Sequence, residues 1–150
     1  MKNAGFAFAL PLLSCLAIAQ QASSAQSPCD EKPISQLQTD RCADCEYKEA
    51  DAHLNKVYSK AMQYMTKDLT PARSKGNEEQ MKYEETAIES LKAAERAWLS
   101  YRNIQCKAAA QQYEGGSMAP MIYAQCLTQI TEHRTAEIKS IYQEGDRKLD

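Results

Sequence analysis

The cysteines of this chain have spacings that could support redox or metal chemistry. Cys42-Ala-Asp-Cys45 is a CxxC pair, which within a βαβ unit is typical of thiol–disulfide exchange and which could bind zinc with His53 and a fourth ligand. No βαβ pattern surrounds the pair, and the sequence has neither a second CxxC nor an HxxxH. We therefore predict a structural disulfide between Cys29 and Cys42, with Cys45 as the odd thiol or as the alternative partner of Cys29.

Motifs for other kinds of catalysis are absent from the sequence. It contains no GxSxG, HExxH, P-loop or GxGxxG motif. The two histidines fall on polar helical faces, and the glutamates between Glu78 and Glu89 include two with a lysine at the spacing of a helix-surface ion pair, Glu78 with Lys82 and Glu89 with Lys92. The sequence thus predicts a protein that is not an enzyme, with no catalytic residues, cofactor or metal ion.

A few polar residues fall where a buried seam is expected. Arg134 interrupts an apolar stripe near the end of the sequence, and counting residues from the predicted turns places Asp51, Glu95 and Trp98 at its height. A charge in an apolar stripe is costly unless it is paired. We therefore predict that Asp51 or Glu95 pairs with Arg134 beside Trp98, as a structural clamp. Arg102, one turn beyond Trp98, is expected to stack on the indole or to bond backbone carbonyls of the N-terminal arm.

Three helices are predicted to position these side chains, because apolar residues recur at helical spacing in three segments. The segments run over residues 40–67, 77–112 and 117–145. Pro71 and Gly76 are expected to break the first helix, and Asn77 opens a capping box for the second. Ser117 is expected to cap the third helix, with Pro120 tolerated in its first turn. Short connections make neighbouring helices antiparallel, so the sequence predicts a small all-α bundle.

Each predicted helix has an apolar seam facing the core. The seams are Ala50, Leu54, Val57, Tyr58, Ala61, Met62 and Met65 in the first helix; Ala87, Leu91, Ala94, Trp98, Tyr101 and Ala108 in the second; and Tyr123, Leu127, Ile130, Ile138 and Ile141 in the third. Cys106 lies nine residues before Gly115, and Cys126 lies ten after Gly116. The two cysteines therefore meet at one height, and a disulfide there would close a loop of about twenty residues and stabilise the fold by about 3 kcal/mol.

Residues 1–25 differ from the rest of the chain and indicate a secretory signal peptide. Lys2 precedes an apolar run over residues 4–19, and small residues permit cleavage after Ala25 or after Ala19. The run is too short and too interrupted for a transmembrane span. Residues 12–15 fit a lipobox poorly, so no lipid anchor is expected at Cys15. The remaining residues, 26–150, are predicted to form one helical domain in the secreted or periplasmic compartment.

Composition and net charge limit the classes of molecule that the protein could bind. The chain has 150 residues, a formal net charge of −2 and 25% charged residues, which are typical of one globular domain. It has no cluster of lysines and arginines of the kind that a nucleic-acid surface requires. Loss of Lys2 with the signal peptide leaves a charge of about −3. An acidic protein of this kind is suited to a basic partner.

Three stretches resemble the signatures of a known family. Residues 49–58 (EADAHLNKVY), 94–106 (AERAWLSYRNIQC) and 115–138 are similar to those of the LprI-like lysozyme inhibitor N-terminal domain family. The matching signature residues are Asp51, Leu54, Asn55, Tyr58, Trp98, Tyr101, Arg102 and Arg134. Glu95 and Asn103 depart from the Gln and Asp that are usual in the family, and Cys45 is additional.

The resemblance implies an exported bacterial protein that inhibits a lysozyme-type muramidase. The cleft of such an enzyme works with two carboxyl groups, and a loop inserted there would exclude the sugar. Tyr113, Glu114 and Ser117 lie in the turn beside the predicted disulfide and are the candidate binding loop. The alternatives are a structural or adaptor protein of the bacterial envelope without a muramidase target, and a thiol–disulfide enzyme built on Cys42 and Cys45.

Overall fold

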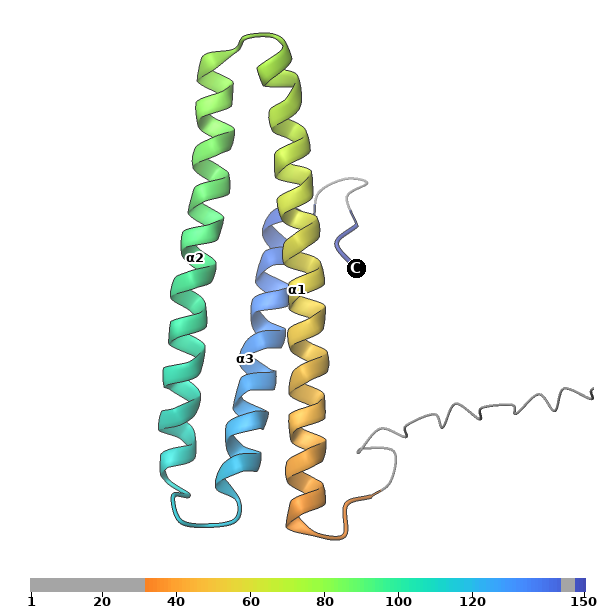
Figure 1. The fold of residues 1–150 in the computed structure, drawn as a ribbon, viewed down its shortest axis with the longest axis vertical. Helices are drawn as coiled ribbons and strands as arrows, with labels where there is room; N and C mark the ends of the chain where they lie inside the picture. The colour runs from red at the N-terminus through yellow and green to blue at the C-terminus, as the bar shows by residue number, and fades with distance from the viewer. Residues whose placement is uncertain (1–31, 144–147) are drawn as a thin grey trace, which may run out of the picture.

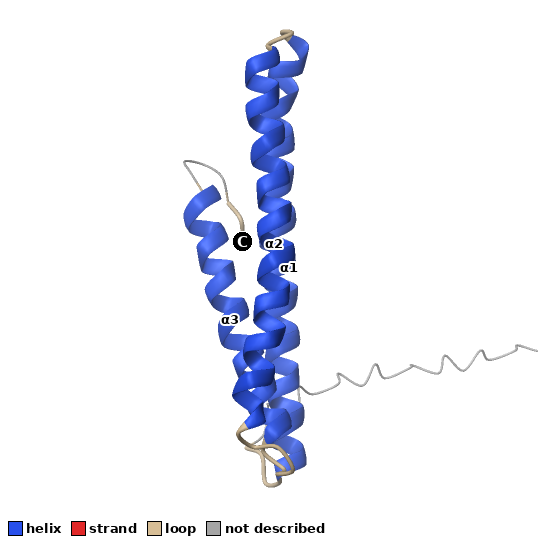
Figure 2. Ribbon diagram, turned by 90° about the vertical axis from the view of Figure 1, so that its left-hand side faces the viewer, coloured by secondary structure: helices blue, strands red, loops and turns tan. Residues whose placement is uncertain are grey.

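A computed structural model describes residues 32–143 and 148–150 and contains three helices: α1 (Gln36–Ser74), α2 (Glu78–Gln111) and α3 (Ala119–Tyr142). α1 and α2 form a long antiparallel hairpin, and α3 packs along one side of it but stops well short of the α1–α2 turn (Figures 1 and 2). The described residues contain no strand, so the predicted all-α bundle of three helices is confirmed. The predicted signal peptide, its cleavage sites, Cys15 and Cys29 lie outside the described residues.

α1 extends beyond the predicted segment at both ends. It starts at Gln36 because the Ser35 side chain caps it, accepting a hydrogen bond from the Gln38 amide at 3.3 Å. The predicted break at Pro71 is wrong, since α1 continues through Pro71 to Ser74, whereas the predicted break at Gly76 is confirmed. Pro71 lies in the last turn and withdraws only the amide that would bond the Lys67 carbonyl, which water can reach because Lys67 is exposed.

The α1–α2 turn is formed by the glycine and the N-cap residue that were predicted for it. Gly76 has a φ of +64°, and the Asn77 amide reaches back to the Ala72 carbonyl at 3.0 Å, which is a Schellman ending. The Asn77 side chain then accepts a hydrogen bond from the Gln80 amide at 3.1 Å and so caps α2. The sharp reversal at this point sets α1 and α2 side by side.

The start of α3 differs from the prediction. Met118, not Ser117, is the N-cap residue, and no side chain bonds to the first free amides of the helix. A run of turns precedes α3. In these turns the Gly116 amide donates to the Tyr113 carbonyl at 3.0 Å, so hydrogen-bonded backbone leads directly into the helix. Pro120 lies in the first turn as expected. α3 ends at Tyr142, and the predicted end near Gly145 lies outside the described residues.

The core lies mainly between α1 and α3 and confirms the predicted seam of α1. Its buried members are Leu54, Val57, Ala61, Met65, Ile88, Leu91, Ile138 and Leu149. On α2, however, the predicted seam residues Ala94, Tyr101 and Ala108 are exposed, and Ile141 of α3 is exposed too. The buried positions of α2 continue instead through Arg102 and Cys106. The predicted α2 seam listed apolar residues alone, whereas the helix turns Arg102 and Cys106 inward and leaves Tyr101 and Ala108 at the surface.

Residues 148–150 return to the helices after α3 has ended. Leu149 is completely buried in the core. The carboxylate of Asp150 pairs with Lys139, and Lys60 donates to its backbone carbonyl. The hydrogen bond from Lys139 holds the pKa of Asp150 below its usual range. Among the described residues, no helix is long and apolar enough to cross a bilayer.

Candidate functional site

A buried arginine lies at the centre of the bundle. The Arg102 side chain on α2 is only 6% exposed, and its Nη1 donates to Oδ1 of Asp51 on α1 at 2.8 Å. The same nitrogen donates to the hydroxyl of Thr131 on α3 at 3.2 Å. One side chain thus ties all three helices together.

Two aromatic rings flank this guanidinium. The guanidinium carbon lies 4.9 Å from the centroid of Trp98 and 5.4 Å from that of Tyr47. Stacking of Arg102 on the indole, which was one of the two predicted alternatives, is therefore confirmed. Burial is the largest influence on Tyr47 and raises the pKa of its phenol. Most of the N-terminal arm, the other predicted partner of Arg102, lies outside the described residues.

Arg134 forms the second buried ion pair of the bundle. Its Nε donates to Oε2 of Glu95 at 3.0 Å, and both side chains are more than four-fifths buried. The guanidinium carbon lies 5.9 Å from the centroid of Trp98. Pairing of Arg134 with Glu95 beside Trp98 is confirmed, whereas the alternative partner, Asp51, is wrong because Asp51 is committed to Arg102. Burial acts to lower the pKa of Arg134, but hydrogen bonds to Glu137 and Glu95 outweigh it, so the pKa is raised.

These two pairs, which both contact the ring of Trp98, make up the polar network of the bundle. Among the described residues, no buried side-chain nitrogen or oxygen lacks a hydrogen-bond partner. Asn55 completes the arrangement by donating to Oδ2 of Asp51 at 3.0 Å. A network whose groups are all satisfied holds its members in one arrangement. We therefore assign Asp51, Arg102, Glu95 and Arg134 to the architecture of the bundle.

The turn between α2 and α3 is anchored by the predicted disulfide. Cys106 and Cys126 are bonded, with their Cα atoms 5.4 Å apart. Tyr113, Glu114 and Ser117 are all exposed in this turn, and Gly115 has a φ of +78°. The candidate loop is thus displayed at one end of the rod (Figure 1). Cys42 is also disulfide-bonded, and its predicted partner Cys29 lies outside the described residues. The Cys45 thiol lies 4.0 Å from a carboxylate oxygen of Glu49.

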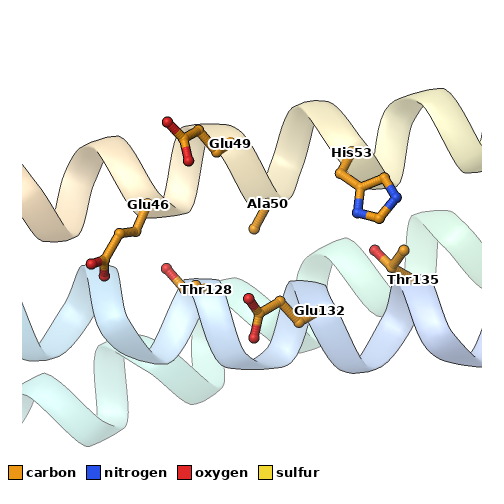
Figure 3. Close-up of a pocket in the computed structure, with 7 residues that line it drawn as sticks. All are labelled: Glu46, Glu49, Ala50, His53, Thr128, Glu132 and Thr135. Carbon is orange, nitrogen blue, oxygen red and sulfur yellow. The ribbon is translucent and has the colours of Figure 1, made fainter. Parts of the chain in front are cut away.

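A groove between α1 and α3 gathers acidic side chains. Its volume is about 450 Å³, and it is lined by Glu46, Glu49, Ala50, His53, Thr128, Glu132 and Thr135 (Figure 3). In the described part of the chain, no lysine or arginine forms an ion pair with any of its three glutamates. His53, at one end of the groove, lies 3.4 Å from Asp150. No group of three or more potential ligands in residues 32–143 and 148–150 could hold a metal ion.

Comparison with known proteins identifies the family. The model of the family described as "Lysozyme inhibitor LprI" matches residues 29–138, which is most of the chain. The chain belongs to the LprI lysozyme inhibitor family. An uncharacterized protein of Rhizobium meliloti (strain 1021), R02472, is 38% identical over 143 residues, covering 92% of this chain and 95% of that protein. No solved structure gives a significant match.

The LprI signature residues divide into two groups in the structure. Leu54 is buried in the core and Tyr58 packs against it, while Asp51, Asn55, Trp98, Arg102 and Arg134 form or support the polar network. Tyr101 is 56% exposed and joins neither group. Most signature residues of the LprI family therefore stabilise the helical bundle.

Sequence reasoning missed several residues of these sites. Tyr47 and Thr131 complete the surroundings of Arg102 but belong to helix faces that the apolar pattern did not mark. Glu46, Glu49 and His53 recur at helical spacing on α1, which could have shown that they share a face. Glu132 could be added to this group only once the packing of α3 on α1 was known.

Proposed function

We propose that this LprI family member is an exported, non-enzymatic protein that binds and inhibits a lysozyme-type muramidase. The family match over residues 29–138 carries the proposal. Two surface features support it: the acidic groove between α1 and α3, and the exposed loop beside the Cys106–Cys126 disulfide.

The acidic groove suits a basic enzyme. Its glutamates lie on two helices that pack against each other, so the backbone positions that carry them are set before any partner arrives. A lysine or arginine of the enzyme that enters the groove would meet carboxylates that pair with no lysine or arginine among the described residues. Complementary charge of this kind mainly accelerates association, and its effect weakens as salt is added.

The loop offers a second point of contact. Tyr113 is 41% exposed, Glu114 accepts a hydrogen bond from Gln111, and the disulfide restrains the helices on either side. A loop that is already ordered loses less conformational entropy on binding than a flexible one does. We propose that Tyr113, Glu114 and Ser117 contact the sugar-binding cleft of the enzyme and block access of the polysaccharide.

An inhibition assay tests this function. The purified chain, with its disulfides oxidised, is titrated against several basic lysozymes, and hydrolysis of peptidoglycan is followed at low and high ionic strength. We expect stoichiometric inhibition of at least one enzyme, with weaker binding in high salt. If no lysozyme is bound or inhibited at either ionic strength, the proposal is wrong, and the alternative of an envelope adaptor without a muramidase target takes its place.

Neutralising the groove should slow complex formation. Replacing Glu46, Glu49 and Glu132 together by glutamine is expected to reduce the association rate about ten-fold or more at low salt, because the steering field is lost. Binding kinetics measured over a range of salt concentrations check this. The matched control replaces the exposed Glu79, Glu85 and Glu89 of α2, which removes the same net charge far from the groove. Equal effects of the two triple changes would show that net charge, not the groove, matters.

Removing the loop aromatic should weaken the complex after it has formed. Tyr113→Ala is expected to raise the dissociation constant about ten-fold or more, because tyrosines at interface centres are frequent hot spots. The thermal midpoint should change little, since the side chain is partly exposed. Tyr83→Ala is the control, because Tyr83 is exposed near the opposite end of α2. Unchanged inhibition by Tyr113→Ala would remove the loop from the binding surface.

A further inference from the structure

α2 has a second apolar seam that faces solvent. The residues of this outer seam are separated alternately by four and three positions, and all but Ser90 are apolar: Tyr83, Ala87, Ser90, Ala94, Ala97, Tyr101, Ile104 and Ala108. Its three large side chains are well exposed, with Tyr83 at 69%, Tyr101 at 56% and Ile104 at 65%. The inner seam of α2, which includes Leu91 and Cys106, already packs against the other helices. Apart from Ala87, which also packs against the core, the outer seam has no such role in the described residues.

The regular alternation indicates what this face would bind. Apolar residues at every 3.5 positions form the seam by which one helix packs along another. The outer seam keeps that spacing over residues 83–108, which is about three-quarters of α2. An apolar surface of this length is suited to another helix of similar length.

We propose that the outer seam pairs antiparallel with the same seam of a second copy of this chain. A two-fold axis between Ala94 and Ala97 makes residue i face residue 191 − i of the partner copy. Each large side chain then meets a small one: Tyr83 faces Ala108, Ile104 faces Ala87, and Tyr101 faces Ser90. The seam is therefore complementary to itself in shape.

The charges beside the outer seam also favour a second copy. The flanking row contains Thr86, Ala93 and Ser100, which are uncharged, and Lys107, which in this register lies at the height of Glu84 of the partner copy. Antiparallel pairing thus places no like charges directly across from each other. The C-terminal half of α2 carries Arg96 and Lys107 on this face, and residues 96–113 include no acidic side chain. The outer seam therefore lacks the negative charge by which the acidic groove is proposed to attract a basic muramidase.

The area of the outer seam determines how strongly two copies of the chain can bind each other. A helix of 26 residues is about 38 Å long, and a contact strip about 10 Å wide buries on the order of 800 Å² in total from both copies. Stable interfaces usually bury about 1,200 Å² or more, so this dimer should be weak and should dissociate on dilution.

Sedimentation equilibrium of the purified chain over a wide concentration range tests the dimer. Ile104→Glu is expected to weaken dimerisation about ten-fold or more, because each dimer loses two buried isoleucines and gains two buried charges. The control is Leu37→Glu, which introduces the same charge at another exposed apolar position, at the start of α1. Circular dichroism checks that both variants stay folded. A chain that is monomeric at every concentration, or a dimer that both substitutions weaken equally, would overturn the proposal.

Cross-linking tests the direction of pairing. A mixture of Ser90→Cys and Tyr101→Cys chains should cross-link to each other in preference to themselves, since these positions face each other only in the antiparallel dimer. Cross-linking of each variant mainly to itself would overturn that arrangement. Phosphatidylglycerol vesicles provide a final comparison: a monomer that binds them through Ile104 would identify the outer seam as a lipid-binding face instead.

Discussion

Replacing Arg102 by alanine is expected to lower the free energy of unfolding by about 3–5 kcal/mol, because removing one partner of a buried pair leaves the other uncompensated. Asp51 would lose the cation that it bonds at 2.8 Å, and Thr131 would lose a donor. The rings of Trp98 and Tyr47 would face a cavity where the guanidinium had been. All three helices are affected at once, so few other single substitutions should cost as much.

Equilibrium unfolding in urea measures this loss. Arg96→Ala is the control, since Arg96 is an exposed arginine on the same helix, and its replacement should change stability by less than about 0.5 kcal/mol. Arg102→Lys separates charge from shape: lysine keeps the charge but lacks the planar fork that bonds two acceptors and stacks on the rings. A loss below about 1 kcal/mol for Arg102→Ala would show that the network contributes little to stability.

Replacing both Cys106 and Cys126 by alanine is expected to cost about 3 kcal/mol, because the unfolded chain regains the freedom of a loop of about twenty residues. The bond joins α2 and α3 close to the turn that connects them. The double variant is preferable to chemical reduction, since Cys42 is also disulfide-bonded and a reductant would act on it too. Thermal and urea unfolding give the magnitude.

The same variant tests the proposed role of the loop. Without the bond, the residues around Tyr113 should become more mobile, and hydrogen exchange of their amides should accelerate. Inhibition should weaken in parallel, because the loop would have to be ordered on binding. A chain that keeps its full stability after losing the disulfide would contradict the first part of this prediction. Unchanged inhibition would contradict the second.

The sequence was sufficient to predict the number of helices and the disulfide, because both follow from spacing along one chain. Apolar periodicity located the helices, and equal distances from the turn located the bond between Cys106 and Cys126. It was not sufficient for the end of α1. Pro71 is a strong helix breaker in the middle of a helix, but it costs little in a last turn where water can satisfy the freed carbonyl.

The polar network was predicted only in part, for a geometric reason. Counting residues from the turns gives the height of a side chain along the bundle but not the direction in which it points. Asp51 and Glu95 were therefore both candidates for Arg134, and only the packed helices show that Asp51 faces Arg102. The seam of α2 was misplaced for a related reason, since Arg102 is charged and yet buried while Tyr101 is apolar and exposed.

The unequal lengths of the helices have a consequence for how the molecule opens. Near the disulfide, α3 and the buried arginines bind three helices into one cooperative block. Beyond the end of α3, the described part of the chain has α1 and α2 packing against each other alone (Figure 1). Local unfolding starts where few apolar groups are buried. The protein should therefore fray from the α1–α2 turn inward while the end that carries the loop stays folded, so the part proposed to meet the enzyme is the last to be lost.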